Sequence, residues 1–148
     1  MYKHILVPTD GTSLSAKAIT TAVRLAGDLG ARVTGVYVVP PYQAPMYSEG
    51  VVYAPALTKA RYKELTRKEA DKALAVLESA AKKAGIACGK EVAEAGQPSR
   101  GIHDVAKAKK ADLIVMASHG RRGLAGVLLG SETVKVLTHS KIPVLVCR

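Results

Sequence analysis

The chain has 148 residues, no Phe, no Trp and a formal net charge of +10. This length suits one domain with a substantial core, which must be built from aliphatic side chains. No apolar run approaches the about 20 residues that cross a bilayer, so a membrane-spanning class is not expected. The N-terminal residues contain no signal-peptide-like apolar stretch, and the sequence therefore predicts a cytoplasmic protein.

Apolar runs and helical spacings alternate along the chain. A first helix is expected to begin at Thr12 or Ser13 and to end at Gly30, because a hydroxyl residue caps the start and glycine the end. The spacing of apolar residues predicts further helices at residues 57–84, 97–110 and 131–139. Apolar runs predict strands at residues 3–7, 32–39, 86–96, 111–118 and 142–147.

This alternation indicates the fold class. Strands that alternate with helices are typical of an open α/β fold with a parallel sheet. The sequence contains no internal repeat, low-complexity tract or linker. We therefore expect residues 1–148 to form a single domain.

The segment VMASHGRRGLAGVLLGSETV, residues 115–134, is the most informative part of the chain. Its glycines follow a buried-strand pattern and precede a predicted helix. No lysine follows its last glycine, as a phosphate-binding P-loop requires, and the first strand is not followed by a dinucleotide fingerprint. A nucleophile elbow and a zinc-protease motif are also absent from the sequence. What remains is Gly120, nine residues, and then Gly130-Ser131 at a helix start, where exposed amides can hold an anion.

In open α/β sheets, ligands bind beyond the carboxyl ends of the strands. The sequence VPTD ends the first strand, and the glycine-rich segment follows the fourth. If these two strands are neighbours, Asp10 and the glycine-rich segment face one crevice.

The sequence resembles the universal stress protein family across essentially its whole length. The similar pieces are ILVPTD, GVYVV, AGQPSRGI and the segment from DLIVMASHG to the end. The nucleotide-binding branch has the pattern G-x2-G-x9-G-[ST], and this chain keeps its spacing with Ala117 in place of the first glycine. The resemblance implies an open five-stranded parallel sheet with helices on both faces, Rossmann-like and adenine nucleotide alpha hydrolase-like, with strand order 3-2-1-4-5.

The same resemblance implies a site for an adenine nucleotide. Asp10 would lie near the ribose or the metal-bound phosphates, and Val38 would offer backbone groups and an apolar wall to adenine. Met116 and Ala117 would border ribose and base. The full set of implied binding residues is Pro8, Thr9, Asp10, Val38, Met116, Ala117, Gly120, Gly130, Ser131 and Thr133, of which the last four would contact phosphates.

Members of this branch bind ATP with a divalent cation such as Mg²⁺ or Mn²⁺, serve in stress survival and are usually homodimers. The resemblance therefore implies a homodimer joined through residues 142–147, an apolar strand at the sheet edge. The sequence contains no complete catalytic constellation, so we expect at most slow ATP hydrolysis.

Several alternatives remain open at the level of sequence. Asp10 could be only a helix cap, and Glu132 beside the phosphates could repel them. The protein could be a dimeric interaction module of the same fold without a nucleotide. A basic nucleic-acid-associated protein is a third class, although most basic residues fit a solvated helix face and no nucleic-acid motif appears. Cys88 and Cys147 are interpreted as reduced, buried thiols, and the scattered histidines are not expected to bind a metal.

Overall fold

A computed structural model gives the structure of this protein and describes residues 1–44, 57–119 and 129–148. The strands are β1 (His4–Pro8), β2 (Arg32–Val39), β3 (Cys88–Glu94), β4 (Leu113–Ala117) and β5 (Val144–Cys147). The helices are α1 (Ser13–Leu29), α2 (Lys59–Lys83), α3 (Pro98–Ala108) and α4 (Ser131–His139). Within the described residues, no helix is both long and apolar enough to span a membrane.

The strands form one five-stranded sheet in the order β3-β2-β1-β4-β5. Every neighbouring pair is parallel, and β1 pairs with both β2 and β4. The expected fold class and the strand order 3-2-1-4-5 are therefore confirmed. The succession of strands changes direction between β1 and β4. The connections that follow these two strands therefore leave the sheet at its topological switch point.

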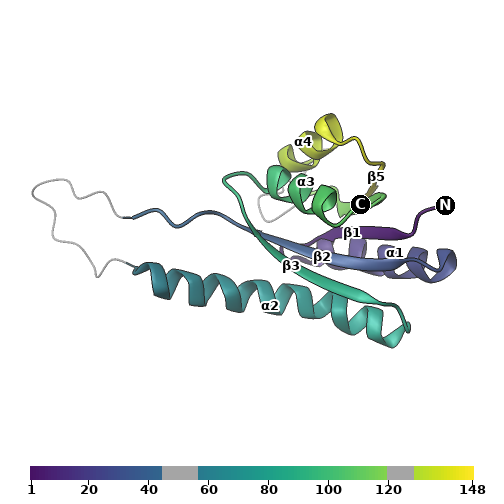
Figure 1. Cartoon of the computed structure of the whole chain (residues 1–148), viewed down its shortest axis with the longest axis horizontal. Coiled ribbons are helices and arrows are strands. Elements are labelled where there is room, and N and C mark those ends of the chain that lie inside the picture. The colour runs from purple at the N-terminus through teal and green to yellow at the C-terminus, as the bar shows by residue number, and fades with distance from the viewer. Residues whose placement is uncertain (45–56, 120–128) are drawn as a thin grey trace, which may run out of the picture.

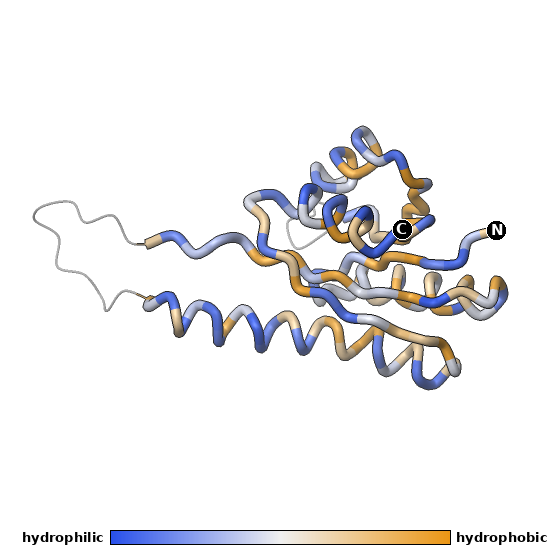
Figure 2. Tube along the Cα trace, in the orientation of Figure 1, coloured by the Kyte–Doolittle hydropathy of each residue, from blue (hydrophilic) through white to orange (hydrophobic). Residues whose placement is uncertain are grey.

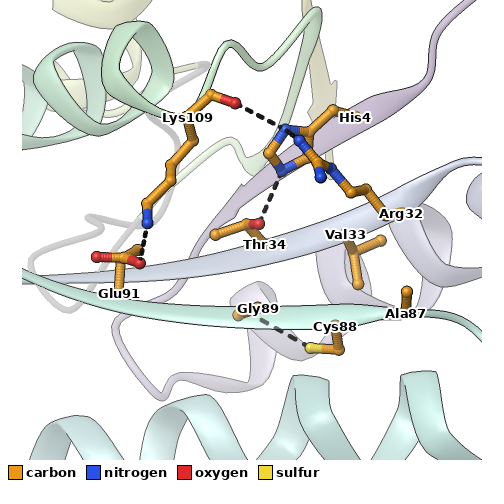
Figure 3. A pocket seen from close by; sticks show the side chains of 9 residues that line it. All are labelled: His4, Arg32, Val33, Thr34, Ala87, Cys88, Gly89, Glu91 and Lys109. Atoms are coloured by element: carbon orange, nitrogen blue, oxygen red, sulfur yellow. Dashed lines mark hydrogen bonds and ion pairs between the residues drawn. The ribbon is translucent and has the colours of Figure 1, made fainter.

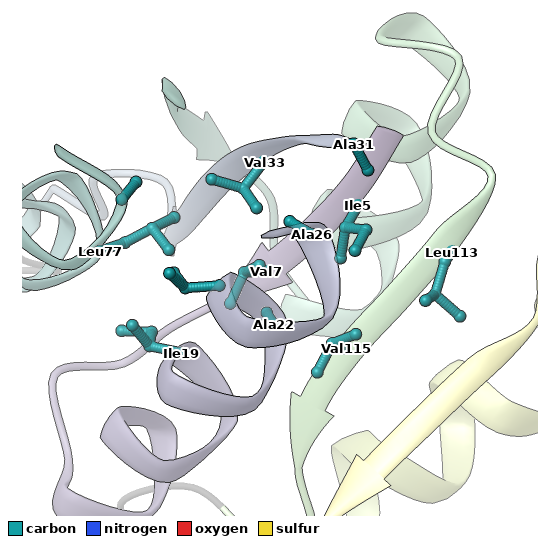
Figure 4. Packing of buried hydrophobic residues seen from close by; sticks show 12 residues of the cluster. Ile5, Val7, Ile19, Ala22, Ala26, Ala31, Val33, Leu77, Leu113 and Val115 are labelled. Carbon is teal, nitrogen blue, oxygen red and sulfur yellow. The ribbon is translucent and has the colours of Figure 1, made fainter. Parts of the chain in front are cut away.

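Helices cover both faces of the sheet (Figure 1). The side chains of Ile5 and Val7 pack against α1 and α2, in a cluster that includes Ile19 and Leu77 (Figure 4). Leu6 points to the other face, where it packs with residues of α3 and α4 such as Ile102. This alternation explains why β1 reads as continuously apolar, since a strand covered on both faces buries every side chain.

The helix α2 is longer than the sheet that it covers. Its buried residues begin only at Ala70, and the turns before this point extend away from the sheet (Figures 1 and 2). This part is tied to the segment after β2 by Tyr62, whose hydroxyl donates to the carbonyl of Pro40 at 2.5 Å. The rings of Tyr42 and Tyr62 also lie 5.6 Å apart.

The ends of six elements differ from the sequence predictions, and among them β4 and α3 are shorter than the predicted 111–118 and 97–110. β1 is displaced by one residue, from 3–7 to His4–Pro8. The helix expected at 57–84 begins at Lys59, because Thr58 caps it by accepting a hydrogen bond from the amide of Arg61. The third strand is shorter than predicted, since the amide of Ile86 still bonds to the end of α2. The fifth strand begins at Val144 rather than at 142.

The turn before β5 explains its late start. The hydroxyl of Ser140 accepts from the amide of Ile142 and donates to the carbonyl of the same residue. The helix ends predicted from glycine and hydroxyl residues agree better, because Thr12 caps α1 and Gly30 ends it with φ of 61°. Cys88 and Cys147 are free thiols as expected, but both are half-buried rather than buried, because they flank the core cluster.

Candidate functional site

The carboxyl ends of β1, β2 and β4 meet at one edge of the sheet. The expectation that the first and fourth strands are neighbours is confirmed by their pairing, in which Leu6 lies opposite Ile114. Just beyond β1, the amide of Thr9 donates to the carbonyl of Val36 on β2 at 3.0 Å. The residues that follow β1 and β4 therefore leave the sheet side by side.

Asp10 shapes the turn between β1 and α1. Its Oδ1 accepts hydrogen bonds from the amide of Thr12 at 3.0 Å, from the Thr12 hydroxyl at 2.7 Å and from the Ser15 hydroxyl at 2.5 Å. The hydroxyl of the buried Thr9 accepts from the amide of Gly11. The N-cap of α1 is therefore Thr12, and Asp10 holds this cap residue in place through Oδ1, which fixes the carboxylate in the turn after β1.

Ala117 is the last residue of β4 and is almost fully buried. Among the described non-glycine residues, a positive φ occurs at Lys110 and not at Ala117. An alanine Cβ is not strained in an extended strand. The replacement of the family glycine by Ala117 therefore imposes no backbone cost at this position.

A compact turn joins the end of β4 to the start of α4. The carbonyl of Ser118 accepts from the amide of Gly130 at 2.7 Å and from the Thr133 hydroxyl at 3.1 Å. The Thr133 hydroxyl also lies 3.2 Å from the carbonyl of Ala117. Thr133 is buried, and these bonds bind the first turn of α4 to β4. Its predicted contact with phosphate stays a prediction, with the hydroxyl already engaged by the main chain.

The first turn of α4 presents amides that no side chain of the described residues caps. Gly130 is the N-cap residue, with φ of −68°, and it offers no side-chain hydrogen bond. The next residue, Ser131, is exposed. The amides at a helix start lack partners within the helix and carry a partial positive charge, so they attract an anion.

Gly130 approaches the end of β4 closely. A Cβ at this position would lie 3.2 Å from the carbonyl oxygen of Ser118 and 3.4 Å from the Cα of His119. Such a distance forces the neighbouring backbone to move by a few tenths of an ångström. Packing alone therefore favours glycine here, in addition to any need for a ligand to approach the backbone.

The carboxylate of Glu132 is directed to α3. Its Oε2 accepts from the amide of Ser99 at 2.9 Å, and its Oε1 lies 2.7 Å from Nζ of Lys135. Burial alone would raise the pKa of Glu132, but the hydrogen bonds from Lys135 and Ser99 outweigh burial and lower that pKa. The repulsion of phosphate considered from the sequence is weakened, because the negative charge is paired with a lysine and with the start of α3.

Val38 and Met116 lie on the face of the sheet that α3 and α4 cover. Met116 is buried in the core cluster of this face, and Val38 is half-buried against it. The helix α3 packs so closely that a Cβ on Gly101 would lie 2.7 Å from Cγ1 of Val38. Pro8, the last residue of β1, is half-buried at the same carboxyl edge of the sheet.

His119 follows Ser118 at the end of β4, and one nitrogen of its ring is buried. Its Nδ1 lies 3.0 Å from the hydroxyl of Ser118, whereas its buried Nε2 has no hydrogen-bond partner. Gly120, Arg121 and Arg122 lie outside the described residues, as does the centre of the predicted nine-residue spacing. The structure thus brings together the two flanks of the glycine-rich segment and leaves the Gly120 prediction untested.

The other histidines bond to nearby main-chain or hydroxyl oxygens. The Nδ1 of His4 lies 3.0 Å from the carbonyl of Lys109, and the Nε2 of His103 lies 3.3 Å from the carbonyl of Val136. Within residues 1–44, 57–119 and 129–148, no group of three His, Cys, Asp or Glu residues could hold a metal ion.

The comparisons agree on one family. The model of the universal stress protein family matches residues 1–148. A universal stress protein of Methanocaldococcus jannaschii is 35% identical over 150 residues, covering 100% of this chain and 83% of that protein.

Two solved structures extend the likeness to the fold. A universal stress protein family member from Burkholderia pseudomallei has a TM-score of 0.75 and 26% identity, covering 99% of this chain and 96% of its own. A universal stress protein solved in complex with cAMP has a TM-score of 0.69 and 28% identity, covering 99% and 97%. The similarity therefore spans the sheet and all of its helices.

Proposed function

Because this chain belongs to the universal stress protein family, we propose that it is an ATP-binding regulatory protein that serves stress survival. In this proposal residues 1–148 act as one cytoplasmic domain. The nucleotide lies at the carboxyl edge of the sheet, between Asp10 and the start of α4. The observation that carries the proposal is the uncapped helix start at Gly130 and Ser131 beside the end of β4.

Three features of the described residues fit an adenine nucleotide. The amides of the first turn of α4 suit phosphate oxygens, and the exposed Ser131 can donate its hydroxyl. Ala117 keeps an extended backbone, so its Cβ leaves the turn unstrained. Val38 and Met116 supply apolar groups for the base. The complex of a related universal stress protein with cAMP supports the same ligand class.

A divalent cation such as Mg²⁺ or Mn²⁺ would accompany ATP and neutralise phosphate charge. Asp10 is the carboxylate in the crevice, and it is fixed through Oδ1 by Thr12 and Ser15. In this proposal Asp10 lies near the ribose or the metal-bound phosphates. We expect at most slow hydrolysis, because the sequence contains no complete catalytic constellation.

We also propose a homodimer joined through the edge strand β5. Leu145 on β5 is 40% exposed, and Val134 and Leu137 on α4 are 45% and 40% exposed. An apolar edge strand with unpaired main-chain groups favours pairing with a second copy. Self-pairing of β5 about a two-fold axis would cover this strand in both subunits.

Extraction and titration test the proposed nucleotide. The purified protein is denatured, and any released nucleotide is identified by chromatography. The stripped protein is then titrated calorimetrically with ATP and Mg²⁺ up to millimolar concentration, with AMP and cAMP as further ligands. We expect saturable heat for ATP. No released nucleotide and no heat with any of the three ligands would contradict the proposal and favour the dimeric interaction module.

A further inference from the structure

A hollow lies at the amino ends of the strands, opposite to the candidate nucleotide site at their carboxyl ends. It has a volume of about 320 Å³ and lies where β1, β2 and β3 begin and α3 ends (Figure 3). Its walls include His4, Arg32 and Thr34 from β1 and β2, and Lys109 just after α3. This volume is at the lower end of the range for small-molecule sites.

The lining carries a net positive charge. Arg32 and Lys109 are cationic, and Glu91 on β3 is the one carboxylate of the lining. Nζ of Lys109 pairs with Oε1 of Glu91 at 2.5 Å, so these two charges offset each other across the hollow. The guanidinium of Arg32 makes no ion pair with any carboxylate in residues 1–44, 57–119 and 129–148. Within the part of the chain that the structure describes, Arg32 is therefore a lining cation that no carboxylate pairs with.

The guanidinium of Arg32 lies against a histidine nitrogen. Its Nη2 is 3.1 Å from Nδ1 of His4, and the same Nδ1 is 3.0 Å from the carbonyl of Lys109. A neutral imidazole nitrogen either donates or accepts, so Nδ1 cannot satisfy both neighbours at once. When Nδ1–H donates to the Lys109 carbonyl, Nδ1 cannot accept from the exposed Arg32, and no other described residue accepts a hydrogen bond from this guanidinium.

The ring of His4 is held by its other nitrogen. Nε2 lies 2.7 Å from the hydroxyl of the buried Thr34. A carbonyl acceptor at Nδ1 and a hydroxyl at Nε2 together fit the tautomer protonated at Nδ1. Burial and the neighbouring Arg32 lower the pKa of His4, so the ring is neutral near pH 7 and adds no charge.

Glycine keeps the floor of the hollow open. A Cβ on Gly89 would lie 3.0 Å from the hydroxyl oxygen of Thr34 on the neighbouring strand and would crowd this side chain. The C-terminal end of α3 faces this edge with its partial negative charge, which opposes an anion. Lys107, Lys109 and Lys110 at the same helix end offset that charge. Arg32 therefore remains the strongest anchor for a ligand.

We propose that this hollow binds a small anion through phosphate or carboxylate oxygens. A guanidinium presents two parallel N–H groups that match such oxygens, and Arg32 is the anchor. Lys109 is the second cation, and it would leave Glu91 in order to pair with the bound anion. The site is independent of the proposed nucleotide site, since it lies at the opposite end of the strands and shares no residue with it.

The test follows amide signals of the whole protein by ¹H–¹⁵N NMR at constant ionic strength. Inorganic phosphate and malonate are titrated separately against chloride. We expect saturable shifts at the amides of Gly89 and Glu91 with at least one of the two anions, and the tighter anion identifies the oxygen chemistry. Arg32→Gln should weaken this binding by about tenfold or more, because the anchor is lost. Lys109→Gln should weaken it less.

Arg24→Gln is the matched control, since Arg24 is an exposed arginine on α1 and does not line the hollow. It should change the affinity by less than about twofold. The proposal is overturned if neither anion shifts Gly89 and Glu91 beyond chloride. It is also overturned if Arg32→Gln and Lys109→Gln bind as tightly as the native chain, or if the shifts are confined to Ser131 at the other edge.

Discussion

The carboxylate of Glu132 on α4 accepts a hydrogen bond from the amide of Ser99 on α3, with 2.9 Å between Oε2 and the nitrogen. The residue that precedes α3, Gln97, makes no side-chain cap of its own. One helix is therefore capped by a carboxylate from the next helix. This contact joins the two helices that cover one face of the sheet, beside the candidate nucleotide site.

Replacement of Glu132 by Gln should destabilise the protein with little effect on a nucleotide. The loss of a charged cap at Ser99 is expected to cost about 1 kcal/mol of unfolding free energy. Urea denaturation measures this change. The nucleotide affinity should stay within about threefold, because the carboxylate is directed to α3 and pairs with Lys135. A large gain in ATP affinity would contradict this orientation and indicate that Glu132 repels phosphate.

Gly130→Val should abolish nucleotide binding while the far-UV circular dichroism stays native. The Cβ of valine would press on the Ser118 carbonyl, 3.2 Å away, and would displace the first amides of α4 from the ligand. Gly27→Val is the control, since a Cβ there meets nothing closer than 3.8 Å. Calorimetric titration with ATP measures both variants. Native affinity in Gly130→Val would exclude the start of α4 as the phosphate site.

The companion change Ala117→Gly should keep or improve nucleotide affinity. It restores the glycine of the family pattern, and the extended backbone of Ala117 means that no strain is relieved. Any gain would therefore come from room for the ribose. The same titration measures it, and a loss of affinity would indicate that this chain uses the Ala117 side chain in a way that the pattern does not describe.

The close packing of α3 against Val38 predicts opposite effects of two Gly→Ala changes. Gly101→Ala places a Cβ 2.7 Å from Cγ1 of Val38 and should lower the unfolding free energy by about 1–3 kcal/mol. Gly27→Ala on α1, where the Cβ would make an ordinary contact 3.8 Å from Cδ1 of Ile86, should raise it by about 0.5–1 kcal/mol. Urea denaturation compares them.

The double variant Gly101→Ala with Val38→Ala tests the stated contact. Removing the two methyl groups of Val38 should recover part of the loss, so the two changes should not add. Additive losses would show that the cost of the Gly101 change arises elsewhere, for example from the backbone of α3.

The sequence predicted helix bounds better than contacts between distant residues, because helix ends are marked by neighbouring residues and distant contacts are not. α4 was predicted with the bounds Ser131–His139 because Gly130 and the hydroxyl residue after it mark the start locally. The order of the strands came from the family resemblance. The Glu132–Ser99 bond joins residues 33 positions apart, and no local pattern announces such a contact.

The same limit applies to the hollow at the other edge. Arg32 reads in the sequence as one more basic residue at a strand start. Its position against the Nδ1 of His4 depends on the pairing of β1 with β2, which places these two residues opposite each other. A charge count alone does not distinguish Arg32 from the other basic residues. Only the tertiary structure separates it from the solvated lysines.

The buried ring of His4 predicts a loss of stability in mildly acidic solution. Burial, and then Arg32, lower the pKa of His4 below its ordinary value of 6.5, although Asp112 acts in the opposite direction. The unfolded chain therefore binds a proton more readily than the native chain does. This contribution to stability is present above about pH 6.5 and is lost as the pH falls from there through the lowered pKa.

The melting temperature between pH 7.5 and pH 5.5 measures this effect. It should fall more steeply for the native chain than for His4→Gln, which cannot take up the proton. In Arg32→Gln the melting temperature should fall less steeply with pH than in the native chain, because this change removes one of the charges that disfavour the imidazolium. Equal slopes for the native chain and His4→Gln would show that His4 does not titrate in this range.

Light scattering at micromolar concentration should give a mass near twice the 15.5 kDa of one chain, because β5 forms an edge of the sheet. Val146→Lys should shift the mass toward one chain, since a lysine on an edge strand blocks pairing with another strand. Val92→Lys is the matched control, because Val92 is a 42% exposed valine on β3, the opposite edge. This control should leave the dimer intact. A dimer lost only in Val92→Lys would move the interface to β3, and a native mass near one chain would refute the dimer whatever the variants do.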